Sequence, residues 1–438
     1  MIIDFDKYSD ILKSTHLTKD SGKVTDVTGL LIKGYIPSVS VGSICEIQAQ
    51  GGRTILAEVV GFKDRQVLMM SLSDMRGISM GSKITLAKSI ATVKVSEELL
   101  GRVVDGLANP LDGLGELEVN KEVPLYSEVV NPLAREPIRQ SLDVGVRAIN
   151  ATITAGRGQR VAIMAGSGVG KSVLMGMMAK HTEADVNVIA LIGERGREVR
   201  EFIENELGPE GMRKTVVVCV TSDQSPLLRM RGAYVATAIA EYFAENGKNV
   251  LLVMDSVTRF AMAMREIGLS IGEPPSTRGY TPSVFSTLPK LLERAGNFEG
   301  AGSITGFYTT LVEGDDMNDP IGDAVRSIVD GHIVLSRALA HKGHYPAIDV
   351  LQSASRVMKA VTTSEHAKNA NKLREILATY KDAEDLINIG AYKAGANPKI
   401  DRAIKLIDPI NNFLKQSTTD HSTMAECVRQ LQSLTVGV

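Results

Sequence analysis

The 438-residue sequence contains no tryptophan, and aromatic residues make up only 4% of it, which disfavours nucleic-acid binding by base stacking. The cysteines Cys45, Cys219 and Cys427 are isolated and have no CxxC spacing, so they indicate neither a zinc site nor a disulfide framework. Lys and Arg (49) almost balance Asp and Glu (51), for a net charge of −2. This balance argues against a protein dominated by contacts with a nucleic-acid backbone.

Long apolar runs are also missing. No stretch approaches the roughly 20 apolar residues that span a bilayer, and residues 1–6 carry acids where a signal peptide needs bases. These features predict a cytoplasmic protein. A hydrophobic fraction of 44% and a charged fraction of 23% are typical of globular proteins, and the length predicts two or three domains.

The first quarter of the chain predicts two regions. Residues 1–21 place apolar side chains on one helical face, as in a helix or strap that packs on its own domain or docks a partner. Residues 22–92 contain short β-rich runs broken by glycine, which predict a small β-barrel. These runs are residues 27–32, 55–60 and 67–71.

Residues 93–360 predict an α/β domain whose first part, from residue 93 to about 143, is a Pro- and Gly-containing strap and linker. Continuous apolar runs alternate here with helical segments, which is typical of a parallel sheet covered on both faces. The runs are residues 161–165, 186–192, 216–220 and 250–254, and the helical segments include 172–180 and 232–245. Residues 361–438 predict a helical C-terminal domain, with helices at 371–389, 400–414 and 424–434.

A glycine-rich loop (AGSGVGKS, residues 165–172) follows an apolar run and opens a helix, so its backbone N–H groups converge on a phosphate. Lys171 is then expected to reach the β- and γ-phosphates of a bound nucleoside triphosphate such as ATP, or the β-phosphate of ADP, and the Ser172 hydroxyl to ligate Mg²⁺. Ala165 departs from the strict pattern, which begins with glycine, but a strand end permits alanine. A chance glycine-rich turn is the alternative, whereas a serine-hydrolase elbow at Ser167 lacks its first glycine. The predicted nucleotide-binding residues of the loop are Gly166, Ser167, Gly168, Val169, Gly170, Lys171, Ser172 and Val173.

Two acids follow apolar runs, where the carboxyl ends of parallel strands meet. Asp255 is expected to hold Mg²⁺, through a water, and also to cap the next helix. Glu194 is expected at the same edge of the sheet, where its carboxylate would polarise the attacking water. Glu198 is expected to pair with Arg195 on a solvated helix.

Six separated motifs, in their order along the chain, resemble those of the catalytic subunits of rotary ATPases and of the type III secretion ATPases. They are residues 100–106, 165–172, 193–198, 251–260, 345–349 and 353–357. The resemblance covers nearly the whole chain and implies a RecA-like P-loop NTPase core, with a mostly parallel sheet. Residues 386–395 and 397–404 are similar to the flagellar export branch rather than the injectisome branch.

The resemblance also implies roles for single residues. Glu194 corresponds to the catalytic carboxylate, with Arg195 and Arg259 as its active-site neighbours. Arg356 resembles an arginine finger that reaches a neighbouring subunit's γ-phosphate, and Tyr345 the ring that packs on adenine. From the residues alone, Arg356 would be a surface ion-pair partner and Tyr345 a core aromatic.

Two further segments have simple interpretations. Residues 268–279 form a Pro- and Gly-rich surface loop, and the resemblance implies that they face a central pore and contact a stalk-like coiled-coil protein. His341 and His344 lack further ligands for a metal, so a solvated turn is expected.

The expected function is Mg²⁺-dependent ATP hydrolysis at the interfaces of a homohexameric ring. The resemblance implies that hydrolysis energises flagellar protein export, including chaperone–substrate release and unfolding, at a gate on the inner face of the membrane, with a peripheral regulator at the N-terminus. Alternatives are an injectisome ATPase and a catalytic subunit of a proton-translocating synthase. The C-terminal motif (386–395 and 397–404) and Gly196 argue against the synthase. A non-catalytic nucleotide-binding subunit is disfavoured by Glu194, and an RNA translocase by the charge and scarce aromatics.

Overall fold

The computed structural model of the chain describes residues 20–119, 121–127, 131–312 and 319–435. Most of the expected N-terminal helix or strap (1–21) lies outside these residues. The chain forms two compact units. One comprises the described residues up to Thr92 together with Glu266–Pro274, and the other comprises Val93–Arg265 and the described residues from Pro275 onward.

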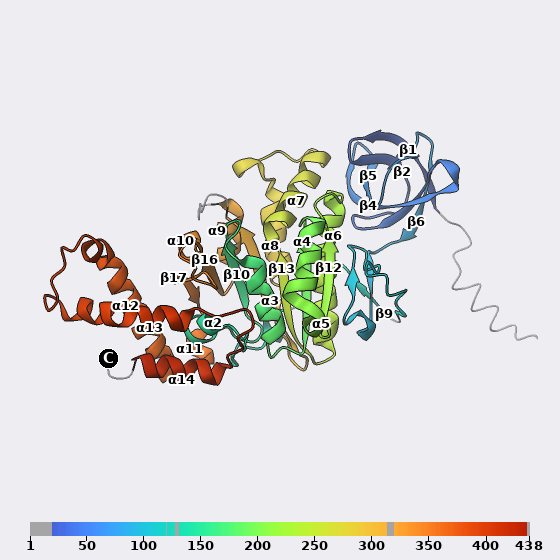
Figure 1. Cartoon of the computed structure of the whole chain (residues 1–438). Coiled ribbons are helices and arrows are strands. Elements are labelled where there is room, and N and C mark those ends of the chain that lie inside the picture. The colour runs from blue at the N-terminus through green and yellow to red at the C-terminus, as the bar shows by residue number, and fades with distance from the viewer. Residues whose placement is uncertain (1–19, 120, 128–130, 313–318, 436–438) are drawn as a thin grey trace, which may run out of the picture. The chain divides into compact units, whose positions relative to one another are not determined.

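The first unit contains the expected β-barrel (Figure 1). Its closed order is β1-β2-β5-β4-β3-β6, with antiparallel neighbours, around a core that includes Ile47, Met69 and Ile84. The strands are β1 (Ser21–Thr28), β2 (Leu31–Tyr35), β3 (Ile44–Gln48), β4 (Thr54–Lys63), β5 (Gln66–Ser71) and β6 (Lys83–Lys88). The expected single run 27–32 is wrong, because Gly29 turns the chain with φ 59° and the run supplies the end of one strand and the start of the next.

The second unit is built on a mostly parallel sheet, as expected, with strand order β17-β16-β10-β15-β13-β11-β12-β8. Only the edge strand β17 and the short β14 run antiparallel to their neighbours. The strands are β8 (Val103–Val104), β10 (Arg160–Ala165), β11 (Val186–Ile192), β12 (Thr215–Val220), β13 (Asn249–Asp255), β14 (Gly296–Asn297), β15 (Ser303–Leu311), β16 (Gly331–Leu335) and β17 (Ile348–Ser355). A separate two-stranded sheet pairs β7 (Thr92–Val95) with β9 (Lys121–Pro124).

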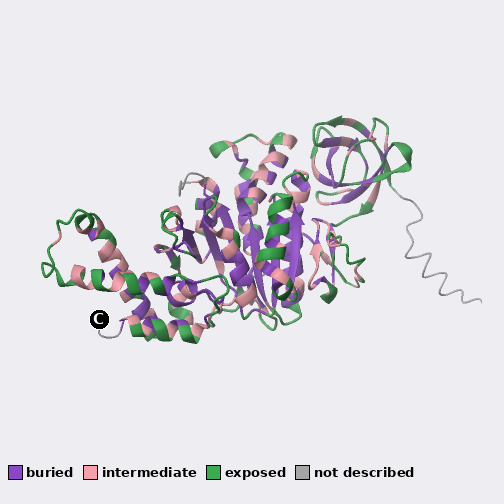
Figure 2. Ribbon diagram, in the orientation of Figure 1, coloured by how far each residue is buried: buried purple, intermediate pink, exposed green. Residues whose placement is uncertain are grey.

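Helices cover this sheet, and Figure 2 shows its strands buried while the outer helix faces are exposed. They are α2 (Arg147–Thr152), α3 (Lys171–His181), α4 (Gly196–Glu201), α5 (Gly208–Met212), α6 (Pro226–Glu245), α7 (Val257–Ile271), α8 (Pro282–Leu292), α9 (Pro320–Ile328) and α10 (Arg337–His341). Helix α6 begins six residues before the expected 232, because Ser225 caps it and Pro226 takes the first helical position. The expected surface loop 268–279 is wrong at its start, because its first four residues end helix α7.

The C-terminal residues form the expected helical region, with α11 (Met358–Val361), α12 (Ser364–Asn388), α13 (Pro398–Leu414) and α14 (Met424–Thr435). Their apolar side chains, such as Leu373 and Ile410, belong to one hydrophobic core with Phe307 and Ile333 of the sheet. The His366 ring bonds the Ala151 carbonyl of α2 (2.9 Å), which ties α12 to that core.

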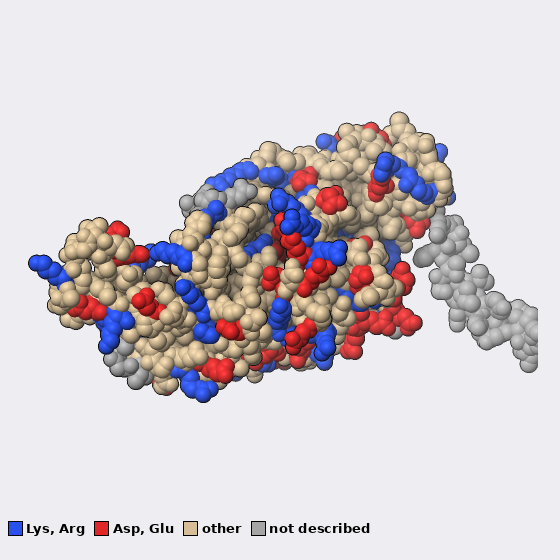
Figure 3. Space-filling model, in the orientation of Figure 1, with Lys and Arg blue, Asp and Glu red and all other residues tan. Residues whose placement is uncertain are grey.

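The surface charges and the state of the cysteines agree with the expectations from the sequence. On the face shown in Figure 3, basic and acidic side chains are interspersed. Cys45, Cys219 and Cys427 are free and buried, and Cys219 is the core residue expected from its apolar run. In the described ranges, no helix is long and apolar enough to cross a membrane.

Candidate active site

The glycine-rich loop lies where β10 gives way to α3. Ala165 is the last residue of β10, so its strand conformation accepts an alanine side chain. Gly168 (φ 76°) and Gly170 (φ 87°) lie in the left-handed region that glycine adopts most readily. The loop therefore bends around a space in front of the helix N-terminus, where backbone N–H groups and the helix dipole favour an anion.

The predicted loop residues divide by exposure. Gly166 and Val169 are buried and hold the loop to the sheet, and Val173 is half-buried on α3. Ser167, Gly168 and Ser172 are exposed. Because Ser172 is exposed, its hydroxyl group is accessible to a metal ion or a phosphate.

Lys171 connects the loop to the two predicted acids. Its Nζ lies 2.5 Å from Asp255 Oδ1 and 3.5 Å from Glu194 Oε1, and each of the three side chains is at most 19% exposed. Asp255 ends β13 and Glu194 follows β11, so adjacent parallel strands deliver both acids to one edge, as the sequence predicts. A phosphate group in the loop would compete with the two carboxylates for the ammonium of Lys171.

The electrostatics give Glu194 an unusual acidity. Burial raises its pKa to about 7, the negative charge of Asp255 adds to this, and Lys171 opposes it. Burial disfavours the charge on Lys171, but Asp255 and Glu194 outweigh that effect and raise the pKa of the ammonium. Glu194 is therefore a carboxyl group that exchanges a proton near neutral pH, beside a lysine that stays charged.

Asp255 has a further partner that sequence reasoning missed. Thr309 of β15 donates its hydroxyl to Asp255 Oδ1 at 2.6 Å, and both side chains are buried. Two residues further along, the Leu311 N–H donates to the hydroxyl of Thr258 (2.9 Å) at the start of α7. The signal was a run rich in β-branched residues, 303–311, which is typical of a strand.

The two arginines after the strands lie differently. Arg195 is exposed and pairs with Glu198 at 3.5 Å, as expected. Arg259 is half-buried on α7, and a Cβ atom built on Gly193 would lie only 2.9 Å from its Cβ. Gly193 has φ 72°, so the turn that leads to Glu194 fits closely against Arg259.

Tyr345 lies beside the phosphate loop. Its ring atoms come within 3.4 Å of a Cβ built on Gly170, and the residue is 47% exposed, so it is no core aromatic. Its backbone carbonyl accepts a hydrogen bond from the Gln416 N–H (2.9 Å) in the C-terminal region. An accessible ring next to the loop provides a flat surface for a nucleotide base.

Arg356 is not gathered into this cluster. It follows the end of β17 and is exposed, and it forms no ion pair within the part of the chain that the structure describes. Ser355 pairs with Gly331 at the start of β16, whereas Ala165 pairs with Leu335 at its end. Arg356 therefore lies at the opposite edge of the sheet from its own phosphate loop.

The histidine prediction is wrong in part. His341 is exposed, but His344 is 5% exposed, and burial lowers its pKa. Only the solvent exposure of His341 agrees with the prediction, because His341 is the last residue of helix α10 and the chain after it folds His344 inward.

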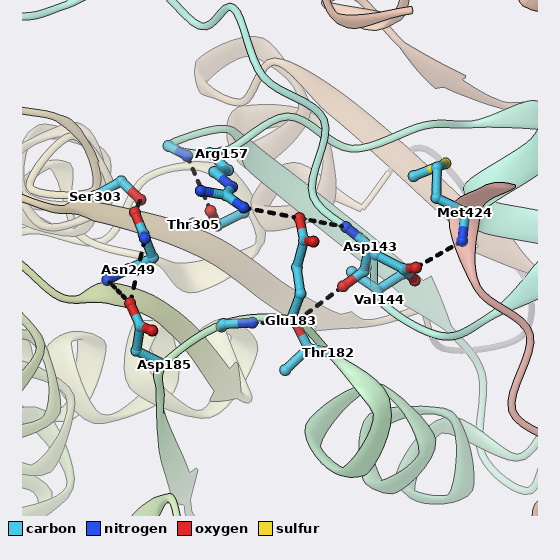
Figure 4. A network of polar contacts seen from close by, with 12 residues as sticks. Asp143, Val144, Arg157, Thr182, Glu183, Asp185, Asn249, Ser303, Thr305 and Met424 are labelled. Atoms are coloured by element: carbon cyan, nitrogen blue, oxygen red, sulfur yellow. Dashed lines mark hydrogen bonds and ion pairs between the residues drawn. The ribbon is translucent and has the colours of Figure 1, made fainter.

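The far end of α3 is anchored by a polar network (Figure 4). Asp143 accepts a bond from the Met424 N–H (2.6 Å) at the start of α14, and its own N–H donates to Glu183 (3.2 Å). The Thr182 hydroxyl donates to the Asp143 carbonyl, and Arg157 pairs with Glu183 at 3.1 Å. The helix that carries Lys171 is thus fixed at both ends.

Family models match three parts of the chain. Residues 18–86 match the beta-barrel domain and 145–355 the nucleotide-binding domain of the ATP synthase alpha/beta family. Residues 362–433 match the C-terminal domain of the type III secretion ATPase EscN.

Whole-chain relatives agree. The chain is 53% identical to the flagellum-specific ATP synthase of Bacillus subtilis, over 97% of this chain and 98% of the relative. It is 48% identical to the type 3 secretion system ATPase of Xanthomonas euvesicatoria, over 94% of each. The chain belongs to the family of flagellum-specific ATP synthases and type 3 secretion ATPases.

Solved structures of this family share the fold. The assembled ATPase EscN of enteropathogenic E. coli superposes with a TM-score of 0.89 at 46% identity, covering 95% of this chain and all of that one. EscN in complex with its central stalk EscO gives 0.88 at 45% identity, with the same coverage. The chain is accordingly a nucleotide-binding ATPase with barrel, sheet and helical parts in the family order.

Proposed function

We propose that ATP hydrolysis takes place where Lys171 lies between Glu194 and Asp255. The proposal depends on the two ion pairs that Lys171 forms with these acids. The ammonium of Lys171 balances the carboxylates of Glu194 and Asp255. Bound ATP presents its γ-phosphate to the same ammonium, and the loop N–H groups at the start of α3 take the phosphate oxygens. Tyr345 packs on the adenine.

The residues present fit a magnesium ion. Asp255 provides carboxylate oxygens and Ser172 an exposed hydroxyl, which are oxygen ligands of the kind that Mg²⁺ prefers. When bound, the ion neutralises charge on the phosphates. Thr309 holds Asp255 by a 2.6 Å hydrogen bond, which keeps one carboxylate oxygen in place.

Glu194 acts as the base. With a pKa of about 7, its carboxylate accepts a proton from the attacking water at working pH, and it returns the proton at little cost after phosphate forms. The water oxygen bonds to the γ-phosphorus as the bond to the ADP oxygen breaks. Arg259 fixes the turn before Glu194, and Arg195 lies exposed beside it as a neighbour of the transferred group.

The site is shared between identical subunits of a ring, most simply a hexamer. Arg356 lies at the opposite sheet edge from its own Lys171, so only another subunit's nucleotide is open to it as a finger. Such a finger is commonly worth ~10³–10⁵ in rate. The assembled form of EscN supports a ring for this chain.

The ring energises flagellar protein export, including release and unfolding of chaperone-bound substrates at a membrane gate. The match of residues 362–433 to a secretion-ATPase domain favours export over a proton-translocating synthase. The complex of EscN with its stalk supports a coiled-coil partner in the pore, contacted by residues 272–279. A regulator binds residues 1–21, and partners recruit the cytoplasmic ring to the inner face of the membrane. Within this assignment, the domains are 1–21, 22–92, 93–360 and 361–438.

Copurification of the tagged chain from its own cells tests the export role. A stalk-like coiled-coil protein and a peripheral helical regulator are expected, whereas proton-channel subunits would indicate a synthase. Phosphate release measured with Lys171→Ala separates this question from catalysis, because that variant should keep the partners and lose turnover.

A further inference from the structure

Strand β17, which leads to Arg356, contains a wide bulge. Along β16, His332 pairs with Ala354 and Val334 pairs with Asp349. Two residue steps on β16 thus correspond to five on β17, and residues 350–353 are pushed out of the ladder. The backbone polar groups of the bulge need partners elsewhere.

Side chains supply those partners. Asp349 Oδ1 accepts the N–H groups of Leu351 (2.9 Å) and Gln352 (3.0 Å). The Ser353 hydroxyl replaces the lost ladder bond, since it accepts the Val334 N–H at 2.9 Å. The remaining carbonyls at the two ends of the bulge face helix α12.

Arg374 of α12 holds both ends of the bulge. Its Nη1 donates to the Val350 carbonyl (3.0 Å) and the Ser353 carbonyl (2.9 Å), and its Nη2 donates to the carbonyl of Thr152 (2.8 Å), the last residue of α2. A planar guanidinium with fixed donors can join three carbonyls from two elements, which a lysine cannot do with the same geometry. One side chain therefore clamps the bulge of β17 to the helical region.

This arrangement costs free energy. Burial lowers the pKa of Arg374, and the side chain forms no ion pair with any residue that the structure describes. The three carbonyl acceptors offset the desolvation of the guanidinium, and they also hold the segments to which they belong in a fixed arrangement. The benefit then lies in the geometry that the clamp imposes.

The clamped geometry determines where Arg356 emerges. Beyond the bulge, the Ser355 hydroxyl donates to the Thr154 carbonyl (2.8 Å), and the Arg356 N–H donates to the Asp330 carbonyl (2.9 Å). A slip of the bulge by one residue would exchange the two faces of the strand and change which residue occupies the end position. Arg374 bonds the carbonyl of Ser353, which precedes Arg356 by three residues in the sequence.

We propose that Arg374 is a positioning residue that sets the reach of Arg356 toward the neighbouring subunit through the bulge of β17. The inference rests on the proposed shared site. According to this proposal, helix α12 affects catalysis in the neighbouring subunit through Arg374 and leaves the site in its own subunit unaffected.

Mixed rings test this directionality. Arg356→Ala subunits keep a complete loop and lack the finger, whereas Lys171→Ala subunits keep the finger and lack their own turnover. A mixture of the two should hydrolyse ATP although each alone is nearly inactive. Arg374→Gln is then added to one partner at a time, with steady-state phosphate release as the readout.

We expect a directional loss. On Lys171→Ala, the finger donor, Arg374→Gln should reduce the restored activity by about 10- to 100-fold, the order expected for a misplaced catalytic group. On Arg356→Ala, the site donor, the activity should stay within about twofold, with an unchanged KM for ATP. Equal loss on both partners, or full activity with the altered finger donor, would overturn the proposal.

The controls separate folding and the shared site from the inference. Lys368→Gln removes an exposed charge from the same helix and should have no effect in either partner. If Arg374→Gln does not assemble, Arg374→Lys enters the same mixtures and should show the same directional loss. If the parent pair fails to restore activity, the shared site itself is refuted and the inference falls with it.

Discussion

Replacing Glu194 by glutamine removes the carboxylate that we propose as the base and preserves the shape of the side chain. A positioned general base commonly contributes ~10²–10⁴ in rate, so kcat should fall by that factor. Nucleotide affinity should change little, because Lys171 and the loop N–H groups remain. The wild-type rate should fall as pH drops below about 7, and this acid limb should be absent from the residual activity of Glu194→Gln.

The same change should stabilise the nucleotide-free protein, with a sign that depends on pH. The folded pKa of Glu194 is raised from 4.5 to about 7, so the folded chain holds the proton more tightly and stability falls as pH rises through that window. The difference corresponds to about 3 kcal/mol of destabilisation above pH 7. Glu194→Gln should remove most of it at pH 8 and change little at pH 4.5.

Two assays decide the matter. Urea unfolding at both pH values gives the stability difference, and phosphate release across pH 5.5–9 gives the rate profile. Glu201→Gln, an exposed acid on the following helix, is the matched control and should leave both unchanged. Near-wild-type turnover by Glu194→Gln, or a loss of stability at pH 8, would refute the assigned role.

Three other substitutions probe the surroundings of the site. Thr309→Val should lower kcat and cost about 1–3 kcal/mol in urea unfolding, because buried Asp255 loses a 2.6 Å bond; no change in either would contradict this. Tyr345→Ala should raise KM for ATP and leave inhibition by inorganic tripolyphosphate unchanged, whereas equal effects on both would exclude a base contact. Burial lowers the pKa of His366 against the opposing bond to the Ala151 carbonyl, so the unfolded chain gains a proton first and stability falls as pH drops below 6.5. His366→Gln should reduce that fall between pH 7 and 5 in thermal melts, and identical slopes would argue against it.

The edge of the sheet that carries the acids was predictable from the sequence. Residues 186–192 and 250–254 are short, largely apolar runs typical of buried strands, and an acid follows each within two residues. Because parallel strands end together, the sequence predicts Glu194 and Asp255 at the same edge of the sheet, whereas their close approach depends on the adjacency of β11 and β13. Distances and the shifted acidity of Glu194 depend on burial that the sequence does not show.

Strand β15 was missed because threonines are interspersed with apolar residues in it, although residues 303–310 are all buried. Thr305 and Thr309 interrupt the apolar run, yet their β-branched side chains pack well in a strand whose backbone bonds both neighbours. Strand order then places β15 between β10 and β13, which brings Thr309 to Asp255. That order is a property of distant pairings, which local patterns do not contain.

The clamp on β17 has a similar origin. Arg374 reads in the sequence as one of several charged residues on a solvated helix. Its contacts with Val350 and Ser353 arise only because β17 bulges at that point and α12 packs against it. The proposal for Arg356, by contrast, came from the resemblance, and the sheet register shows only that Arg356 lies at the opposite end of β16 from its own phosphate loop.

The central claim is that identical chains complete one another's active sites. Specific ATPase activity measured against protein concentration, with assembly followed in the same samples by mass photometry, tests it most directly. Activity per chain should rise in step with assembly in the wild type and stay low at every concentration for Arg356→Ala. Full activity per chain from the wild-type monomer at high dilution would contradict the account.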